Sequence, residues 1–147
     1  MKRTNFNVPA KNTLWSILMA MTVFFFTSCT HKISFLTSAA APAARGYVEI
    51  KKDKNKNNVI QVHLSNLAEV GRLTPPKQTY VVWMLTNDDV MKNIGQIKSS
   101  TNKLTKNLEA SFETVSSFSP TKIIITAEDD ENVQYPSSQV VLTTDRF

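Results

Sequence analysis

The sequence predicts an all-β protein: an antiparallel β-sandwich of about seven strands, similar to an immunoglobulin domain, preceded by a signal peptide and a flexible tether. Between residues 46 and 144, apolar residues alternate with polar ones or form short runs bounded by polar clusters. The longest runs are rich in β-branched residues, which favour strands. About 100 residues suffice for one core without disulfides, and the chain has one Cys. We therefore expect a single folded domain over residues 46–147.

The first two predicted strands form a hairpin. Residues 47–51 and 59–64 alternate between apolar and polar side chains, and the polar segment 52–58 between them is rich in Lys and Asn. In the second of these strands the apolar side chains face inward and His63 faces outward. A long connection, residues 66–77, follows.

Two further strands are predicted next. Residues 79–86 are apolar on both faces, as in a central strand that is covered on both sides. Trp83 is expected in the core, whereas Tyr80, three residues away, is expected to cover the opposite face with its hydroxyl near solvent. The pattern of residues 90–98 indicates a weaker strand, in which Gly95 marks a bulge or a close backbone approach.

The last three predicted strands differ in strength. Residues 121–128 and 138–144 show clear strand patterns. Residues 108–114 are ambiguous, because the apolar side chains in and before this segment also recur every fourth position, as in a helix. We predict a strand there.

The first 28 residues have the pattern of a signal peptide. Three basic residues and no acidic residue precede a 13-residue apolar run, residues 14–26, which is followed by Thr27 and Ser28. Thirteen helical residues span about 20 Å, less than the ~30 Å hydrocarbon core of a bilayer. A permanent transmembrane helix is therefore disfavoured.

Phe26, Thr27, Ser28 and Cys29 together resemble a relaxed bacterial lipobox of the Bacteroidetes type. This resemblance implies cleavage before Cys29 and lipidation of its thiol; simple secretion and an uncleaved anchor are the alternatives. Thr30, rather than Asp, follows the Cys, and no acidic stretch comes next. By the same resemblance, these features imply an outer-membrane protein that faces the periplasm.

Residues 29–45 are predicted to comprise the lipidated Cys29 and a flexible tether. Small residues and one Pro dominate residues 30–45, with little periodicity. Contacts of Phe35 and Leu36 with the domain or with lipid headgroups are the alternative. We expect disorder in this segment.

Several short motifs occur in a familiar order. They are Asn66-Leu67, the Tyr-x-x-Trp strand at residues 80–85, Gly95, Thr126-Ala127-Glu128, and Pro136 followed by Val140-Val141-Leu142. In this order they resemble the C-terminal extracytoplasmic domain of anti-sigma-K factors. The resemblance covers residues 46–144 and implies no catalytic residue. The 13 residues ahead of the apolar run leave no room for a helical sigma-binding domain, so no binding to a sigma factor is expected.

The chemistry-bearing residues are few. His31 and His63 are the only imidazoles, and we expect both to be solvated rather than catalytic. We therefore predict no catalytic residue, no metal site and no cofactor. Glu128, Asp129, Asp130 and Glu131 offer oxygen ligands for Ca²⁺, but they lack the spacing of a calcium loop, and this question stays open.

The charge balance argues against nucleic acid as a partner. Of the 17 basic residues, 14 lie from Cys29 onward, against 12 acidic residues, so the mature chain is nearly neutral. The densest basic segment, residues 51–56, suits either a solubilising turn or contact with anionic lipid headgroups or polysaccharide.

Together these patterns predict a non-enzymatic envelope lipoprotein with a binding or structural domain. Its expected partners are the membrane, through the lipid anchor, and another envelope protein. The alternative is a ligand- or stress-sensing periplasmic domain related to extracytoplasmic sigma-factor regulation.

Overall fold

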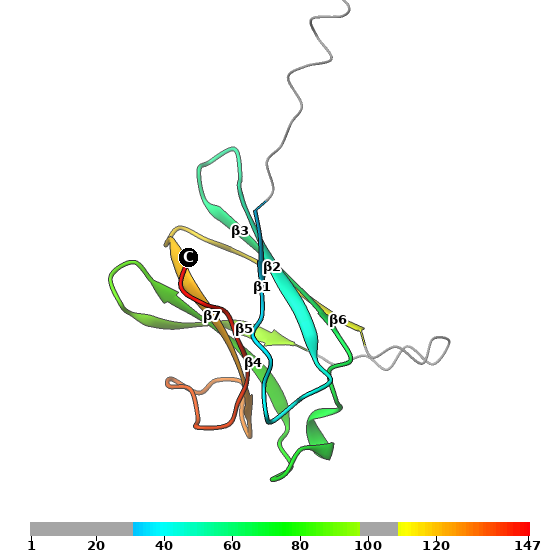
Figure 1. The fold of residues 1–147 in the computed structure, drawn as a ribbon. Helices are drawn as coiled ribbons and strands as arrows, with labels where there is room; N and C mark the ends of the chain where they lie inside the picture. Colours follow the sequence, from blue (N-terminus) through cyan, green and yellow to red (C-terminus); the bar gives the residue numbers. More distant parts are fainter. Residues whose placement is uncertain (1–30, 98–108) are drawn as a thin grey trace, which may run out of the picture.

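The structure is a computed structural model that describes residues 31–97 and 109–147 (Figure 1). These residues form eight strands: β1 (His31–Ser34), β2 (Arg45–Lys52), β3 (Asn58–Ser65), β4 (Thr79–Thr86), β5 (Met91–Ile97), β6 (Glu109–Ser116), β7 (Pro120–Glu128) and β8 (Val140–Thr143). A short 3-10 helix, η2 (Val70–Arg72), interrupts the connection between β3 and β4. No helix among the described residues has the length and apolar character needed to span a bilayer.

The strands form two four-stranded antiparallel sheets. The first sheet has the order β1-β2-β3-β6 and the second sheet has the order β5-β4-β7-β8. Alternating side chains of both sheets meet in one core, which explains why the period-2 pattern predicts these strands. The largest fully buried side chains of the core are those of Ile60, Leu67, Tyr80, Met84, Ile123, Ile125 and Leu142. The prediction of an antiparallel β-sandwich is confirmed.

The seven predicted strands are present as β2 to β8. The bounds of β4 are those predicted, residues 79–86. The ambiguous segment 108–114 is a strand in its described part, because β6 pairs with β3 along its whole length, from Asn58 opposite Ser116 to Ser65 opposite Glu109. Tertiary pairing therefore decides between the helical and the extended pattern.

The prediction of a flexible tether over residues 30–45 is wrong for the described part of that segment, residues 31–45. β1 pairs with β2, from His31 opposite Ile50 to Ser34 opposite Tyr47. Phe35 then forms a bridge to Thr144, at the edge of the second sheet. The side chains of Phe35, Ala41 and Ala44 are buried in the core. One apolar residue, Ile33, is enough for this four-residue strand, because the neighbouring strand β2 supplies its hydrogen bonds.

Gly95 marks both a bulge and a close approach, as its position in the sequence predicts. Val82 pairs with Gly95 and Trp83 with Asn93, so one extra residue lies in β5 between these pairs. Gly95 has φ of 138°, a backbone conformation that favours glycine. A Cβ atom there would lie 2.7 Å from Cε2 of Phe112 in β6. This glycine therefore lets β5 and β6 approach each other at one side of the sandwich.

Candidate functional site

Tyr80 and Trp83 lie on opposite faces of the second sheet, but each on the face not expected for it. Tyr80 points into the core between the sheets, and its hydroxyl donates a hydrogen bond to the Ala68 carbonyl oxygen at 2.9 Å. The expectation of a hydroxyl near solvent is therefore wrong, and burial raises the pKa of Tyr80 to about 12. Trp83 is fully buried, as predicted, but it lies outside that core, on the outer face of the sheet.

A chain of buried hydrogen bonds begins at Trp83. Its Nε1 donates to Oγ1 of Thr126 at 2.8 Å, and that hydroxyl donates to Oε1 of Glu128 at 2.5 Å. The same carboxylate oxygen accepts a bond from the backbone N–H of Ser137 at 2.8 Å. Thr126 and Glu128 are both buried, so each polar atom in this chain needs the partner that it has here.

The loop between β7 and β8, residues 129–139, lies across this outer face (Figure 1). Asn93, which stands opposite Trp83 in β5, donates from Nδ2 to the carbonyl oxygens of Glu131 at 3.0 Å and Val133 at 3.2 Å. At the end of the loop, Nε2 of Gln139 donates to the Pro75 carbonyl oxygen at 3.2 Å. The loop is thus fixed by polar contacts at both ends, and its position accounts for the burial of Trp83.

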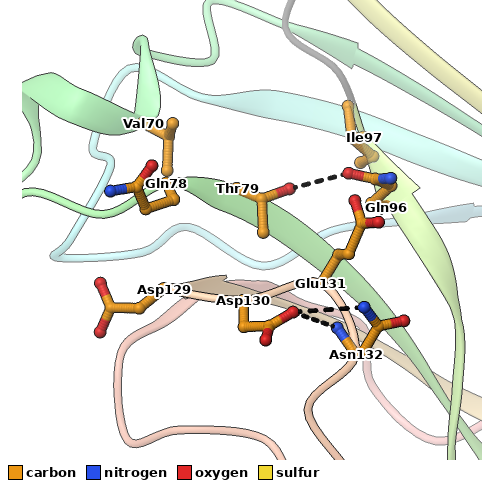
Figure 2. Close-up of a pocket in the computed structure, with 9 residues that line it drawn as sticks. All are labelled: Val70, Gln78, Thr79, Gln96, Ile97, Asp129, Asp130, Glu131 and Asn132. Atoms are coloured by element: carbon orange, nitrogen blue, oxygen red, sulfur yellow. Dashed lines mark hydrogen bonds between the residues drawn. The ribbon is translucent and has the colours of Figure 1, made fainter.

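A pocket of about 520 Å³ opens beside this loop (Figure 2). Its lining residues are Val70, Gln78, Thr79, Gln96, Ile97, Asp129, Asp130, Glu131 and Asn132. Oγ1 of Thr79 donates to Oε1 of Gln96 at 3.3 Å, which joins β4 to β5 at one wall. Three acidic side chains on one wall give the pocket a negative character.

These carboxylates do not converge on one point. Asp129 pairs with Nζ of Lys77 at 2.5 Å, and Asp130 accepts a bond from the backbone N–H of Asn132 at 2.9 Å. In Figure 2, Asp129, Asp130 and Glu131 point in different directions. Within residues 31–97 and 109–147, no group of three His, Cys, Asp or Glu side chains is placed to hold a metal ion. The acidic corner at residues 128–131 therefore does not form the oxygen cage that Ca²⁺ needs.

The outer face of the first sheet carries a stacked pair of rings. Tyr47 and His63 are paired residues of β2 and β3, and their ring centroids lie 4.9 Å apart. Nζ of Lys32 lies 4.5 Å from the centroid of the Tyr47 ring. The pair borders a hollow of about 680 Å³ that extends over β3 and β6. His63 thus faces outward, as predicted.

Charged side chains form a row beside these rings. Glu49 accepts bonds from Lys51 at 3.0 Å and from Lys32 at 3.4 Å. The bond from Lys51 is the main reason that the pKa of Glu49 lies below its ordinary value; partial burial opposes this shift and Lys32 adds to it. Gln61 continues the row: it accepts from Lys51 at 3.2 Å and donates to Glu113 at 2.6 Å.

The two histidines are not brought together. His31 pairs with Ile50 and His63 with Tyr47, and these partners are three residues apart in β2, so the two imidazoles belong to opposite faces. The stacking of Tyr47 on His63 was missed by sequence reasoning. A hairpin centred on Asn55 pairs position 47 with position 63. The position of the turn in the sequence could therefore have identified this pair.

The basic segment at residues 51–56 forms the tip of the β2–β3 hairpin, as predicted. Oδ1 of Asp53 accepts the backbone N–H groups of Asn55 at 2.7 Å and Asn57 at 2.8 Å. Burial acts to raise the pKa of Asp53, but the hydrogen bonds from Asn57 and Asn55 outweigh it, so the pKa is lowered. The side chains of Lys52, Lys54 and Lys56 remain exposed.

Cys29 lies outside the described residues, so its lipidation stays a prediction. No model of a protein family, no curated protein and no solved structure matches this chain. The resemblance to the anti-sigma-K factor domain likewise stays a prediction.

Proposed function

We propose that this protein is a non-enzymatic, lipid-anchored component of the bacterial envelope, whose β-sandwich binds or supports another envelope component. The observation that carries this proposal is that His31, two residues after the only Cys of the chain, already belongs to a strand of the β-sandwich. That Cys follows a basic segment, an apolar run and two small residues, which is the order of a lipoprotein signal. The sorting features after Cys29 favour the outer membrane and the periplasmic side.

A role in binding is supported by the outer face of the first sheet. Its polar side chains are held in a fixed row by bonds to one another, from Lys32 through Glu49 and Lys51 to Gln61 and Glu113. A surface ordered in this way loses little conformational freedom when a partner binds. Tyr47, stacked on His63, adds a rigid aromatic contact of the kind that binding surfaces favour.

Mass spectrometry of the N-terminal peptide, taken from the membrane fraction of cells, tests the anchor. The proposal expects a mature chain that starts at Cys29 and carries a diacylglyceryl group on its thiol. A chain that still starts at Met1, or a mature chain with an unmodified Cys29, contradicts it. Crosslinking in the intact envelope, followed by identification of the crosslinked proteins, then tests whether the domain has a protein partner.

A ligand-sensing domain is the second candidate, and the pocket beside the β7–β8 loop favours it. Asp130 and Glu131 line the pocket, so a small cationic ligand is the class that suits its charge. A ligand that binds only the folded state raises the melting temperature in a concentration-dependent way. Screening polyamines and amino sugars by thermal melting tests this candidate, because the double variant Asp130→Asn/Glu131→Gln is expected to abolish any increase.

A further inference from the structure

Several segments of the described chain meet at one end of the sandwich, which we call the anchor end. It consists of the β2–β3 turn (residues 53–57), the β4–β5 turn (residues 87–90), the β6–β7 turn (residues 117–119) and the C-terminal residues 145–147. Hydrogen bonds join them: Nδ2 of Asn58 to the Phe118 carbonyl oxygen at 2.9 Å, Asn87 N–H to Ser119 at 3.2 Å, and Phe147 N–H to Thr121 at 3.0 Å.

β1 begins at this same end. His31 pairs with Ile50, just before the basic hairpin tip, and Figure 1 shows the described chain entering β1 beside that hairpin. His31 is two peptide units from Cys29, so their Cα atoms lie within about 7 Å of each other whatever the backbone conformation. A lipid on Cys29 therefore holds the anchor end close to the bilayer. A flexible tether of sixteen residues, in contrast, would leave the orientation of the domain free.

Exposed apolar side chains gather at the anchor end. Val90 is 48% exposed, Phe118 45% and Phe147 40%, and each belongs to a different anchor-end segment. Nζ of Lys92 lies 4.2 Å from the centroid of the Phe118 ring, which places a positive charge beside this apolar side chain. Apolar side chains flanked by cations are the combination that binds the interface between headgroups and acyl chains.

The side chains next to the start of β1 carry positive charge. Lys52, Lys54 and Lys56 are exposed on the hairpin tip, whereas the only acid of the tip, Asp53, faces its own backbone N–H groups. On the other side of the anchor end, Asp89 is paired with Arg146, and the acids Asp88 and Asp145 are exposed. The sector nearest to Cys29 is therefore basic, and anionic phospholipid headgroups are its complement.

We propose that the anchor end rests on the bilayer surface, with Val90, Phe118 and Phe147 among the headgroups and the hairpin lysines on anionic lipid phosphates. This inference deepens the proposed function and rests on the lipidation of Cys29. Because acyl chains already retain the protein, the contact serves to orient it, and the high local concentration of headgroups makes weak contacts sufficient. In this orientation the pocket beside the β7–β8 loop points away from the bilayer.

The test uses the full-length lipidated protein in vesicles of phosphatidylethanolamine and phosphatidylglycerol that carry a nitroxide lipid quencher. A fluorophore is attached through Ser117→Cys at the anchor end or, as the matched control, through Gln134→Cys in the β7–β8 loop. Both positions are exposed, and acylation of Cys29 blocks the native thiol. The proposal expects strong quenching at position 117 and several-fold weaker quenching at position 134. Equal quenching at the two positions overturns it.

Matched variants test separately how the lysines and the apolar side chains contribute to the proposed contact with the bilayer. Lys54→Glu and Phe147→Ser are each expected to reduce quenching at position 117 at least twofold. Arg72→Glu and Tyr135→Ser, which change exposed side chains away from the anchor end, are expected to leave it unchanged. Equal effects of the two pairs also overturn the proposal.

The mass of the N-terminal peptide distinguishes the two ways of failing. An unmodified Cys29 refutes the proposed function itself. An acylated Cys29 with equal quenching at positions 117 and 134 refutes only the orientation of the domain.

Discussion

The outer face of one sheet of this sandwich is covered, whereas the outer face of the other sheet is open. The second sheet covers its outer face with its own loop and buries Trp83, Thr126 and Glu128 beneath it. The first sheet leaves its outer face open, with Tyr47 and its charged neighbours partly exposed. The comparison shows that the sequence of a strand matches the state of its outer face. β4 is apolar on both faces and lies in the sheet whose outer face is covered, whereas β3 alternates between buried and partly exposed side chains and lies in the sheet whose outer face is open.

The largest effect is expected from the covered face. Replacing Trp83 with Ala removes a fully buried side chain and is expected to lower the free energy of unfolding by about 3–5 kcal/mol. Replacing Tyr47 with Ala on the open face is expected to cost less than about 1 kcal/mol. Urea denaturation of both variants measures the difference. Comparable losses would show that the two faces contribute equally to stability.

The buried hydrogen-bond chain gives the next largest effect. Thr126→Val keeps the shape of the side chain but leaves Trp83 Nε1 and the Glu128 carboxylate without their shared partner. We expect a loss of about 1–3 kcal/mol in the free energy of unfolding. Thr79→Val is the matched control, because the Thr79 hydroxyl bonds Gln96 in a partly buried place, and its cost is expected to be below about 1 kcal/mol. A smaller loss for Thr126→Val than for Thr79→Val would contradict this account.

Between the sheets, Tyr80 makes stability depend on alkaline pH. Its pKa is about 12 in the folded protein and about 10 when exposed, so the unfolded state loses this proton first. The contribution is fully present below pH 10 and falls as the pH rises toward 12. Equilibrium denaturation across this range measures the decline. Tyr80→Phe is expected to flatten it, and Tyr47→Phe is not. If stability falls in the same way in Tyr80→Phe, another group causes the pH dependence.

The smallest effect is expected from the charged row on the open face. The pKa of Glu49 lies below 4.5 in the folded state, so this carboxylate stabilises the protein at neutral pH and loses that contribution as the pH falls through its lowered pKa. Glu49→Gln is therefore expected to be slightly less stable than the wild type at pH 7 and to lose this difference in acid. Thermal melts of both proteins at pH 7 and in acid provide the test. A difference in melting temperature that grows in acid would contradict this prediction.

The sequence predicts most of this fold because alternation and β-branched runs are local signals. The bounds of β4 follow directly from residues 79–86, which are apolar on both faces. β1 was not predictable in the same way: four residues with one apolar side chain become a strand only because β2 lies beside them. The small residues that follow, such as Ala41 and Ala44, indicate flexibility by composition, although here they fill the core.

The candidate sites were less predictable than the strands. Spacing places Tyr80 and Trp83 on opposite faces but does not tell which face meets the other sheet. The face that carries Trp83 lies outside the core between the sheets, and the nearby β7–β8 loop is held by bonds to Asn93 and Pro75, which are far from it in the sequence. The gathering of Val90, Phe118 and Phe147 at the anchor end likewise requires three turns to be placed together, which no periodicity encodes.

The central claim is that Cys29 carries the lipid that attaches this domain to its membrane. Its most direct test is to express Cys29→Ser beside the wild type and Thr30→Ser, follow incorporation of labelled palmitate, and separate membrane from soluble protein. The wild type and Thr30→Ser should be labelled, shortened by residues 1–28 and recovered in membranes, whereas Cys29→Ser should remain unlabelled and full length. A Cys29→Ser protein that is still shortened and still sediments with membranes would show that attachment does not depend on this thiol.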